Sequence, residues 1–255
     1  MPVVLIEKQT PQITVLTLNR PERRNALTIE SMTELAVAIE NAAADPATRI
    51  AILRGAGKAF CTGLDLQEAA VKEPHATAEA AARLFLALAE TRLVTIAAVH
   101  GAAVAGGAGI MSACDFVIAA ERTKIGYPEV RRGLVAGLVM TFLRRQLRER
   151  DLREVLLASE LFEAERAREI GLVNRVVPAS ELESETQKIA ASVLQGAPGA
   201  ISNSKRLMEE LWSTSVREDI ERALRHHLEA RESIEAKEGV AAYNEKRPPN
   251  WTLGH

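Results

Sequence analysis

The feature of this sequence that most constrains its fold is an uncharged, glycine-rich stretch over positions 96–109. It reads Ile-Ala-Ala-Val-His-Gly-Ala-Ala-Val-Ala-Gly-Gly-Ala-Gly, and Gly-Tyr-Pro-Glu follows at 126–129. An apolar run that ends in glycines and continues into Ile110 and Met111 predicts a buried strand, a tight turn and a helix. The first N–H groups of such a helix lack intrahelical acceptors, so they can stabilise a carbonyl oxygen as it becomes an oxyanion. Glu129 is a candidate proton carrier beside them.

Two other interpretations of the stretch fit less well. The dinucleotide signature GxGxxG is incomplete, because Ser112 stands where a third glycine is required after Gly107 and Gly109. Residues 93–113 contain no Asp, Glu, Lys or Arg, which is also a property of a short membrane span. Four glycines and His100 within it argue against a span, so we expect no membrane contact.

Composition narrows the functional classes. The chain has 255 residues with 32 basic and 34 acidic side chains and a net charge of −2, so nucleic-acid binding is not indicated. Cys61 and Cys114 lie in apolar surroundings without a CxxC spacing, which favours reduced core thiols in a cytoplasmic protein. The histidines form no metal-ligand pattern, since His226 and His227 point to two different faces of a helix. We therefore expect no metal.

The hydrophobic periodicity alternates between strands and helices and predicts an α/β fold. Strands are expected at 3–6, 13–18, 50–54, 95–99, 116–119 and 173–177, with helices from Thr28 onward and over 78–91. The strand, turn and helix pattern recurs about every 45–50 residues. Downstream of Gly196–Gly199, residues 200–246 have helical periodicity only. We predict a core over 1–195 and a helical region over 196–255 whose apolar positions make oligomer contacts.

Several segments together carry a family resemblance. They are Asn19–Leu27, Lys58–Asp65, Ala97–Asp115, Gly126–Val130, Gly171–Pro178 and Glu238–Lys246. In this order they cover nearly the whole chain, which resembles the crotonase superfamily, the enoyl-CoA hydratase/isomerase family. The resemblance implies a spiral of repeated ββα units, a C-terminal helical trimerisation region, and homotrimers that often pair into hexamers. It also implies an acyl-CoA thioester substrate and no separate cofactor, because coenzyme A is part of the substrate.

Carried over by position, the resemblance assigns the oxyanion-hole amides to Leu64 and Gly106 and one catalytic glutamate to Glu129. The amides would bind the thioester oxygen as an enolate forms. The positions implied for coenzyme A binding are Arg24, Ala26, Leu64, Asp65 and Leu66, with Tyr243 and Lys246 from a neighbouring subunit. A lysine of the family is replaced by Gln67, so its phosphate contact would be either lost or taken over by Arg23 or Arg24.

The sequence departs from the family's hydratases at Gly109, which stands where a second glutamate is usual. Hydration with one carboxylate remains possible if Glu129 delivers the water's own proton, and a one-base allylic shift is simpler still. We expect an enoyl-CoA hydratase, a lyase. The alternatives are a Δ3,Δ2-enoyl-CoA isomerase and, from another class, a non-catalytic acyl-CoA- or RNA-binding homologue. If Gly109 marks a lost second carboxylate, a glutamate placed there would restore the two-carboxylate geometry, whereas in an isomerase it would obstruct the acyl pocket. A positive φ at 109 would in either case destabilise the fold of such a variant.

Two charges beside the expected site have no assigned role. Arg131 and Arg132 follow Glu129 closely, and either one could lower the pKa of the glutamate or meet an acidic acyl group. Paired arginines on a helix are more commonly surface groups, and adjacent helical positions do not share one face.

Overall fold

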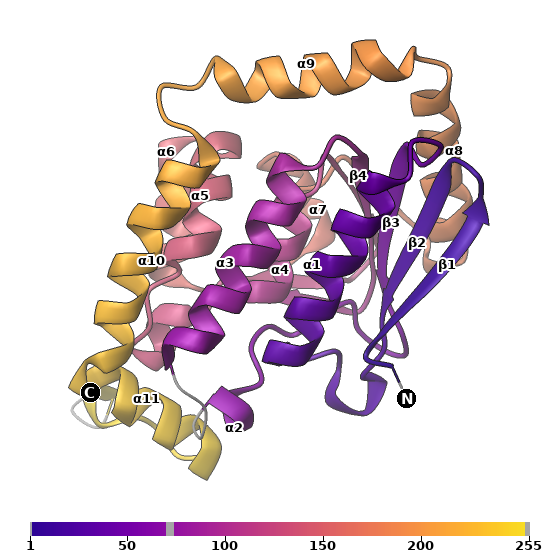
Figure 1. Ribbon diagram of the computed structural model, residues 1–255. Coiled ribbons are helices and arrows are strands. Elements are labelled where there is room, and N and C mark those ends of the chain that lie inside the picture. The colour runs from indigo at the N-terminus through magenta and orange to yellow at the C-terminus, as the bar shows by residue number, and fades with distance from the viewer. Residues whose placement is uncertain (1, 70–73, 253–255) are drawn as a thin grey trace.

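The computed structural model describes residues 2–69 and 74–252 and contains a six-stranded sheet of order β1-β2-β3-β4-β6-β9 (Figure 1). Strands β1 and β2 are antiparallel, whereas the pairs from β2 to β9 are parallel. The strands of this sheet are β1 (Val4–Thr10), β2 (Ile13–Leu18), β3 (Ile50–Gly55), β4 (Val94–Val99), β6 (Phe116–Ala120) and β9 (Arg175–Val177). A smaller sheet joins β5 (Ala102–Val104), β7 (Lys124–Gly126) and β8 (Phe162–Glu163).

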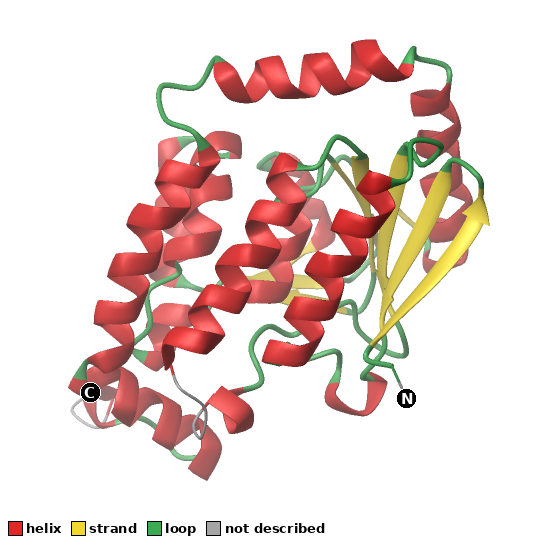
Figure 2. Ribbon diagram, in the orientation of Figure 1, coloured by secondary structure: helices red, strands yellow, loops and turns green. Residues whose placement is uncertain are grey.

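Side chains of the parallel strands alternate between the two faces of the large sheet, and both faces are buried. One face packs against the layer of helices seen in Figure 2, and the other packs against α8. The described helices and helical turns before the C-terminal region are η1 (Pro21–Arg23), α1 (Ile29–Ala44), α2 (Leu66–Ala69), α3 (Pro74–Glu90), α4 (Gly106–Ser112), η2 (Glu129–Arg132), α5 (Gly137–Gln146), α6 (Glu149–Arg153), η3 (Glu154–Ala158), α7 (Ala164–Glu169), η4 (Ala179–Glu181) and α8 (Leu182–Leu194).

The C-terminal region is helical, as predicted, and its helices pack differently from one another. It contains α9 (Pro198–Glu210), α10 (Val216–Glu232), α11 (Ile234–Glu245) and η5 (Asn250–Thr252). Helix α10 packs against α3 and α5, and α11 returns to η2 and α2. Helix α9 spans the top of the molecule in Figure 1, where Leu207, Met208 and Leu211 are more than half exposed.

The expected helix start at Thr28 is confirmed. Its side chain accepts from Ser31 N while the Ser31 side chain accepts from Thr28 N, which satisfies two amides at the start of α1. The predicted bounds differ mainly at two strands: β1 continues to Thr10, and the last strand begins at Arg175 rather than at 173. Backbone pairing with β2 extends β1 beyond its apolar residues, and the hydrophobic pattern of the sequence does not predict this extension.

Candidate active site

The two glycine turns identified in the sequence meet in space. Strands β3 and β4 are parallel neighbours, with Ile52 opposite Ile96, so the segments after them leave the sheet at the same edge. A bridge joins those segments, because Cys61 N donates to Ala102 O at 3.1 Å and Val104 N donates to Cys61 O at 3.0 Å. The pairing therefore brings the turn before Leu64 next to the start of α4.

The backbone at this junction is held in uncommon conformations. Gly63 has φ +82°, and a Cβ placed on it would lie 2.8 Å from Ala105 Cβ and 3.2 Å from Gly106 N. Ala105, which precedes α4, has φ 50° and ψ −125°, a conformation that costs a non-glycine residue on the order of 1–3 kcal/mol. Only a glycine at 63 fits against this strained turn.

The amides of Leu64 and Gly106 are the groups that this backbone presents. Leu27 N donates to Gly63 O and Asp65 N donates to Leu27 O, each at 2.8 Å, and this parallel bridge directs the N–H of Leu64 the other way. Gly106 is the first residue of α4, so its N–H has no acceptor within the helix. Among the described residues, no backbone oxygen accepts from either amide. Both residues line one pocket, in which the two N–H groups are available to an oxyanion.

Glu129 is attached to the same junction through the small sheet. Strand β7 pairs with β5, Ala105 N donates to Gly126 O at 2.8 Å, and Glu129 begins η2 three residues later. The Tyr127 hydroxyl, fully buried between them, lies 2.7 Å from Ser112 Oγ on α4. The carboxylate is thus fixed relative to the helix that carries Gly106.

The environment of Glu129 suits a group that exchanges protons. Its Oε2 is buried and has no hydrogen-bond partner among the described residues. Burial raises the pKa of Glu129 to about 7, although the nearby Arg132 charge acts in the opposite direction. A carboxyl group with a pKa near neutrality can both accept and return a proton under physiological conditions.

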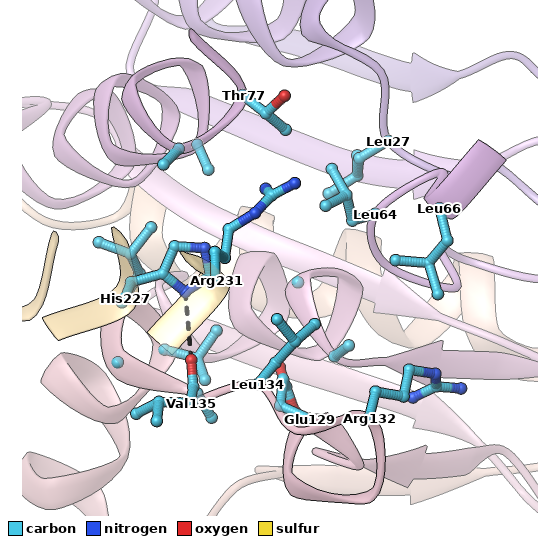
Figure 3. A pocket seen from close by; sticks show the side chains of 18 of the residues that line it. Leu27, Leu64, Leu66, Thr77, Glu129, Arg132, Leu134, Val135, His227 and Arg231 are labelled. Atoms are coloured by element: carbon cyan, nitrogen blue, oxygen red, sulfur yellow. Dashed lines mark hydrogen bonds between the residues drawn. The ribbon is translucent and has the colours of Figure 1, made fainter. Parts of the chain in front are cut away.

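The pocket around these groups is mostly apolar and encloses about 940 Å³, including open space at its mouth. Figure 3 shows the carboxylate of Glu129 together with Leu27, Leu64 and Leu134 at this cavity. Its remaining apolar wall comes from α3 and α5, with Leu84 and Phe85 on the first helix. Such a wall excludes water and strengthens every electrostatic contact inside.

Gly109 does not open into this pocket. A Cβ placed there would lie 2.4 Å from Val139 Cγ1 and 2.8 Å from Phe85 Cζ, two side chains that do line it. Gly109 lies within α4 and has no positive φ, so packing rather than backbone strain limits substitution. The space that a second glutamate would need is filled by an aromatic ring and a branched side chain.

The residues implied for coenzyme A binding in the first two loops lie close together, with different exposure. Leu66 lines the pocket, Ala26 is half-buried and Arg24 is exposed. Asp65 is buried instead and forms ion pairs with Arg20 at 3.1 Å and Arg23 at 3.2 Å. These pairs lower the pKa of Asp65 against the opposing effect of its burial, so its carboxylate holds the two loops together.

Arg23 and Arg24 differ in whether their side chains are available to contact a phosphate group. Arg23 also donates to Gln67 Oε1 at 2.7 Å, so its guanidinium is engaged by the protein itself. Arg24 accepts from Thr62 Oγ1 through its carbonyl oxygen, which leaves its side chain as the candidate for the phosphate contact.

Tyr243 and Lys246, implied for a neighbouring subunit, lie at the end of α11. Tyr243 lines the pocket of its own chain, where the Arg132 guanidinium lies 4.5 Å from its ring centroid. Lys246 is exposed and lies outside that lining. The structure thus places Tyr243 at the site of its own chain, because α11 folds back onto η2.

Arg131 and Arg132, the two arginines after Glu129, have different surroundings. Arg131 is exposed and donates to Ala158 O at 3.1 Å, outside the pocket lining, whereas Arg132 lines the pocket and donates to Pro128 O. Two basic pocket residues were missed by the sequence analysis, His227 and Arg231 of α10. Their i, i+4 spacing on one helix face is the only sequence signal that could have indicated them.

Within the described ranges, no group of three or more His, Cys, Asp or Glu side chains is arranged to hold a metal ion. No helix there is long and apolar enough to cross a membrane. The uncharged stretch at 93–113 contains β4, β5 and α4.

Known enzymes resemble this chain in both sequence and structure. The sequence pattern of the enoyl-CoA hydratase/isomerase family matches residues 8–253. A putative enoyl-CoA hydratase of Thermus thermophilus is 36% identical over 97% of this chain and 100% of its own length. A crotonyl-CoA hydratase of Syntrophomonas wolfei is 33% identical over 97% of both chains. The crystal structure of carnitinyl-CoA hydratase from Mycobacterium avium superposes with a TM-score of 0.88 at 32% identity, over 98% of both chains.

Two available amides and a buried carboxylate in one apolar pocket form a candidate enzyme active site, which has the groups needed to stabilise an oxyanion and to move a proton. The chain belongs to the enoyl-CoA hydratase/isomerase family and has the crotonase fold.

Proposed function

We propose that this enzyme is an enoyl-CoA hydratase, which adds water across the 2,3-double bond of an acyl-CoA thioester. The N–H groups of Leu64 and Gly106 bind the thioester oxygen and stabilise the enolate that forms when water attacks C3. Glu129 accepts a proton from that water and delivers a proton to C2. The observation that carries the proposal is the buried, unpartnered Oε2 of Glu129 in the pocket that both amides line.

One carboxylate has to perform both proton transfers. Residue 109 is a glycine, and a side chain at that position would have to displace Phe85 and Val139. A pKa of Glu129 near 7 keeps both protonation states accessible, which a single acid–base group requires. The same arrangement also serves a Δ3,Δ2-enoyl-CoA isomerase, in which one base moves a proton from C2 to C4. This second candidate is favoured specifically by the absence of a carboxylate at 109.

An assay of crotonyl-CoA and 3-hexenoyl-CoA in parallel separates the two reactions. The proposal expects loss of the conjugated enoyl absorbance with crotonyl-CoA to be faster than its appearance with 3-hexenoyl-CoA. The reverse order of rates would identify an isomerase. Binding of acetoacetyl-CoA without turnover of either substrate would instead indicate a non-catalytic acyl-CoA-binding homologue.

Coenzyme A would lie along the loops that contain Arg24, Ala26 and Leu66, with the backbone of Leu64 and Asp65 beside it. Tyr243 would cover it at the mouth of the pocket, and Lys246 is available to a phosphate group. We expect no metal and no separate cofactor. Calorimetry with acetoacetyl-CoA, with and without chelator, tests this expectation, because affinity lost with chelator would contradict it.

A homotrimer or a pair of trimers is the proposed assembly in the cytoplasm. The exposed apolar residues at the C-terminal end of α9, Met208 within the helix at 68% and Leu211 directly after it at 78%, are suited to burial between subunits. Light scattering on the purified protein tests the assembly. Charged substitutions at both positions are expected to shift it toward the monomer.

A further inference from the structure

Two basic side chains enter the pocket from helix α10. His227 and Arg231 are one helical turn apart, and both line the cavity that holds Glu129. Figure 3 shows them side by side, with Arg231 extending across the cavity toward Thr77. His227 Nδ1 lies 3.1 Å from Val135 O, which accepts its proton and fixes the ring.

Most of the wall beside these groups is apolar. Helix α3 contributes Ala78, Ala81, Leu84 and Phe85 next to the polar Thr77, and α5 adds Leu138 and Val139. Burial lowers the pKa of Arg231 and of His227 below their ordinary values, so both groups are partly removed from water. A straight, uncharged acyl chain would gain nothing from a guanidinium in such a wall. An anionic group would form a charge-assisted hydrogen bond there.

The position of Arg231 relates it to the acyl end of the substrate. Arg132 lies with Leu66 on one side of the cavity, whereas the helix that carries Arg231 lies on the opposite side (Figure 3). Leu66 belongs to the loop proposed for coenzyme A. A thioester whose oxygen lies at Leu64 and Gly106 therefore extends its acyl chain away from Arg132 and toward α3 and α10.

We propose that Arg231 determines substrate specificity by binding a carboxylate at the far end of the acyl chain, so that the preferred substrates are ω-carboxy-2-enoyl-CoA thioesters. This inference rests on the proposed function and deepens it. Arg131 lies outside the pocket, and Arg132 lies beside Tyr243 at the opposite side, so neither is placed to make this contact. The planar guanidinium can bind a carboxylate in bidentate fashion.

Calorimetry with unreactive saturated ligands tests the inference without requiring turnover. Glutaryl-CoA and adipoyl-CoA are compared with 5-methylhexanoyl-CoA and 6-methylheptanoyl-CoA, in which an isopropyl group replaces the carboxylate. We expect the native enzyme to bind the better diacid thioester roughly tenfold to a hundredfold more tightly than its neutral counterpart. Arg231→Met should remove this preference. Arg225→Met should keep it, because Arg225 is an exposed residue of the same helix.

The possible outcomes test the role of Arg231 separately from the proposed function. Equal affinity of the native enzyme for a diacid thioester and its neutral counterpart would overturn the inference and leave the proposed function intact. A preference that survives in Arg231→Met would show that another group binds the carboxylate, which also overturns it. If the native enzyme binds none of the four thioesters, the proposed function fails and the inference fails with it. The comparison on the native enzyme stands even if Arg231→Met does not fold.

Discussion

Phe85 occupies the space that a side chain at position 109 would need, because a Cβ on Gly109 would lie 2.8 Å from its Cζ. Val139 Cγ1 is closer still, at 2.4 Å. Phe85 and Val139 of the pocket wall therefore fill the space that the missing side chain of Gly109 leaves. Glutamate at 109 would have to displace that wall before its carboxylate could reach a substrate, so the single substitution is not a simple restoration of a two-carboxylate site.

Substitution of Gly109 by alanine should destabilise the enzyme by about 1–3 kcal/mol, as overpacking of a core does. Combining it with Val139→Ala should recover part of that loss, since the closest atom to the new Cβ is then removed. Denaturant unfolding of the two single variants and the double variant measures the coupling. Strictly additive losses would show that the two positions are not in contact.

The rate should depend on pH through Glu129. Both proposed reactions begin with the ionised carboxylate as base, and burial raises its pKa to about 7. We expect kcat/KM for the best substrate to fall about tenfold per pH unit below that value and to level off above it. A profile that stays flat from about pH 5.5 to pH 8 would exclude this assignment.

The same raised pKa predicts that the stability of the fold decreases as pH rises, whereas the rate increases. The folded protein holds the Glu129 proton up to about pH 7, whereas the ordinary value for the unfolded chain is 4.5. Stability is therefore lost as pH rises between these values, by roughly 3 kcal/mol in total. Glu129→Gln lacks this loss, so its unfolding free energy relative to the native enzyme should increase between pH 5 and pH 8. A constant difference between the two proteins would contradict the burial of the carboxylate.

Gly63→Ala tests the oxyanion hole. Alanine disfavours φ +82°, and its Cβ would lie 2.8 Å from Ala105 Cβ, so the adjacent amides must shift. Loss of one oxyanion donor typically lowers kcat by about 10²–10³-fold. The control is Gly199→Ala, where a Cβ meets nothing within 4 Å. Normal kcat in a folded Gly63→Ala enzyme would show that the turn does not position a catalytic amide.

The sequence predicted those parts of the site that local chemistry determines. Gly63, Gly106 and Glu129 each come within one short loop of a strand, and Thr28 caps α1, so turn and capping preferences indicated these positions. The family resemblance predicted the fold, the oxyanion assignments at Leu64 and Gly106 and the catalytic role of Glu129.

What the sequence did not predict depends on how distant helices pack. Arg231 lies about a hundred residues from Glu129 in the chain, and only the packing of α10 against α3 and α5 brings it to the pocket. The fit of Phe85 against Gly109 depends likewise on α3 meeting α4. Tyr243 reaches the pocket of its own chain because α11 turns back onto η2, an orientation that periodicity does not encode.

The most direct test of the account is a comparison of the native enzyme with Glu129→Gln in the hydration of crotonyl-CoA, at saturating substrate and at pH 8. Glutamine keeps the size of the side chain and removes the base. We predict that turnover falls about 10²-fold or more while the affinity for acetoacetyl-CoA is largely retained. Near-normal turnover in a folded Glu129→Gln enzyme would contradict the claim that this carboxylate carries the proton.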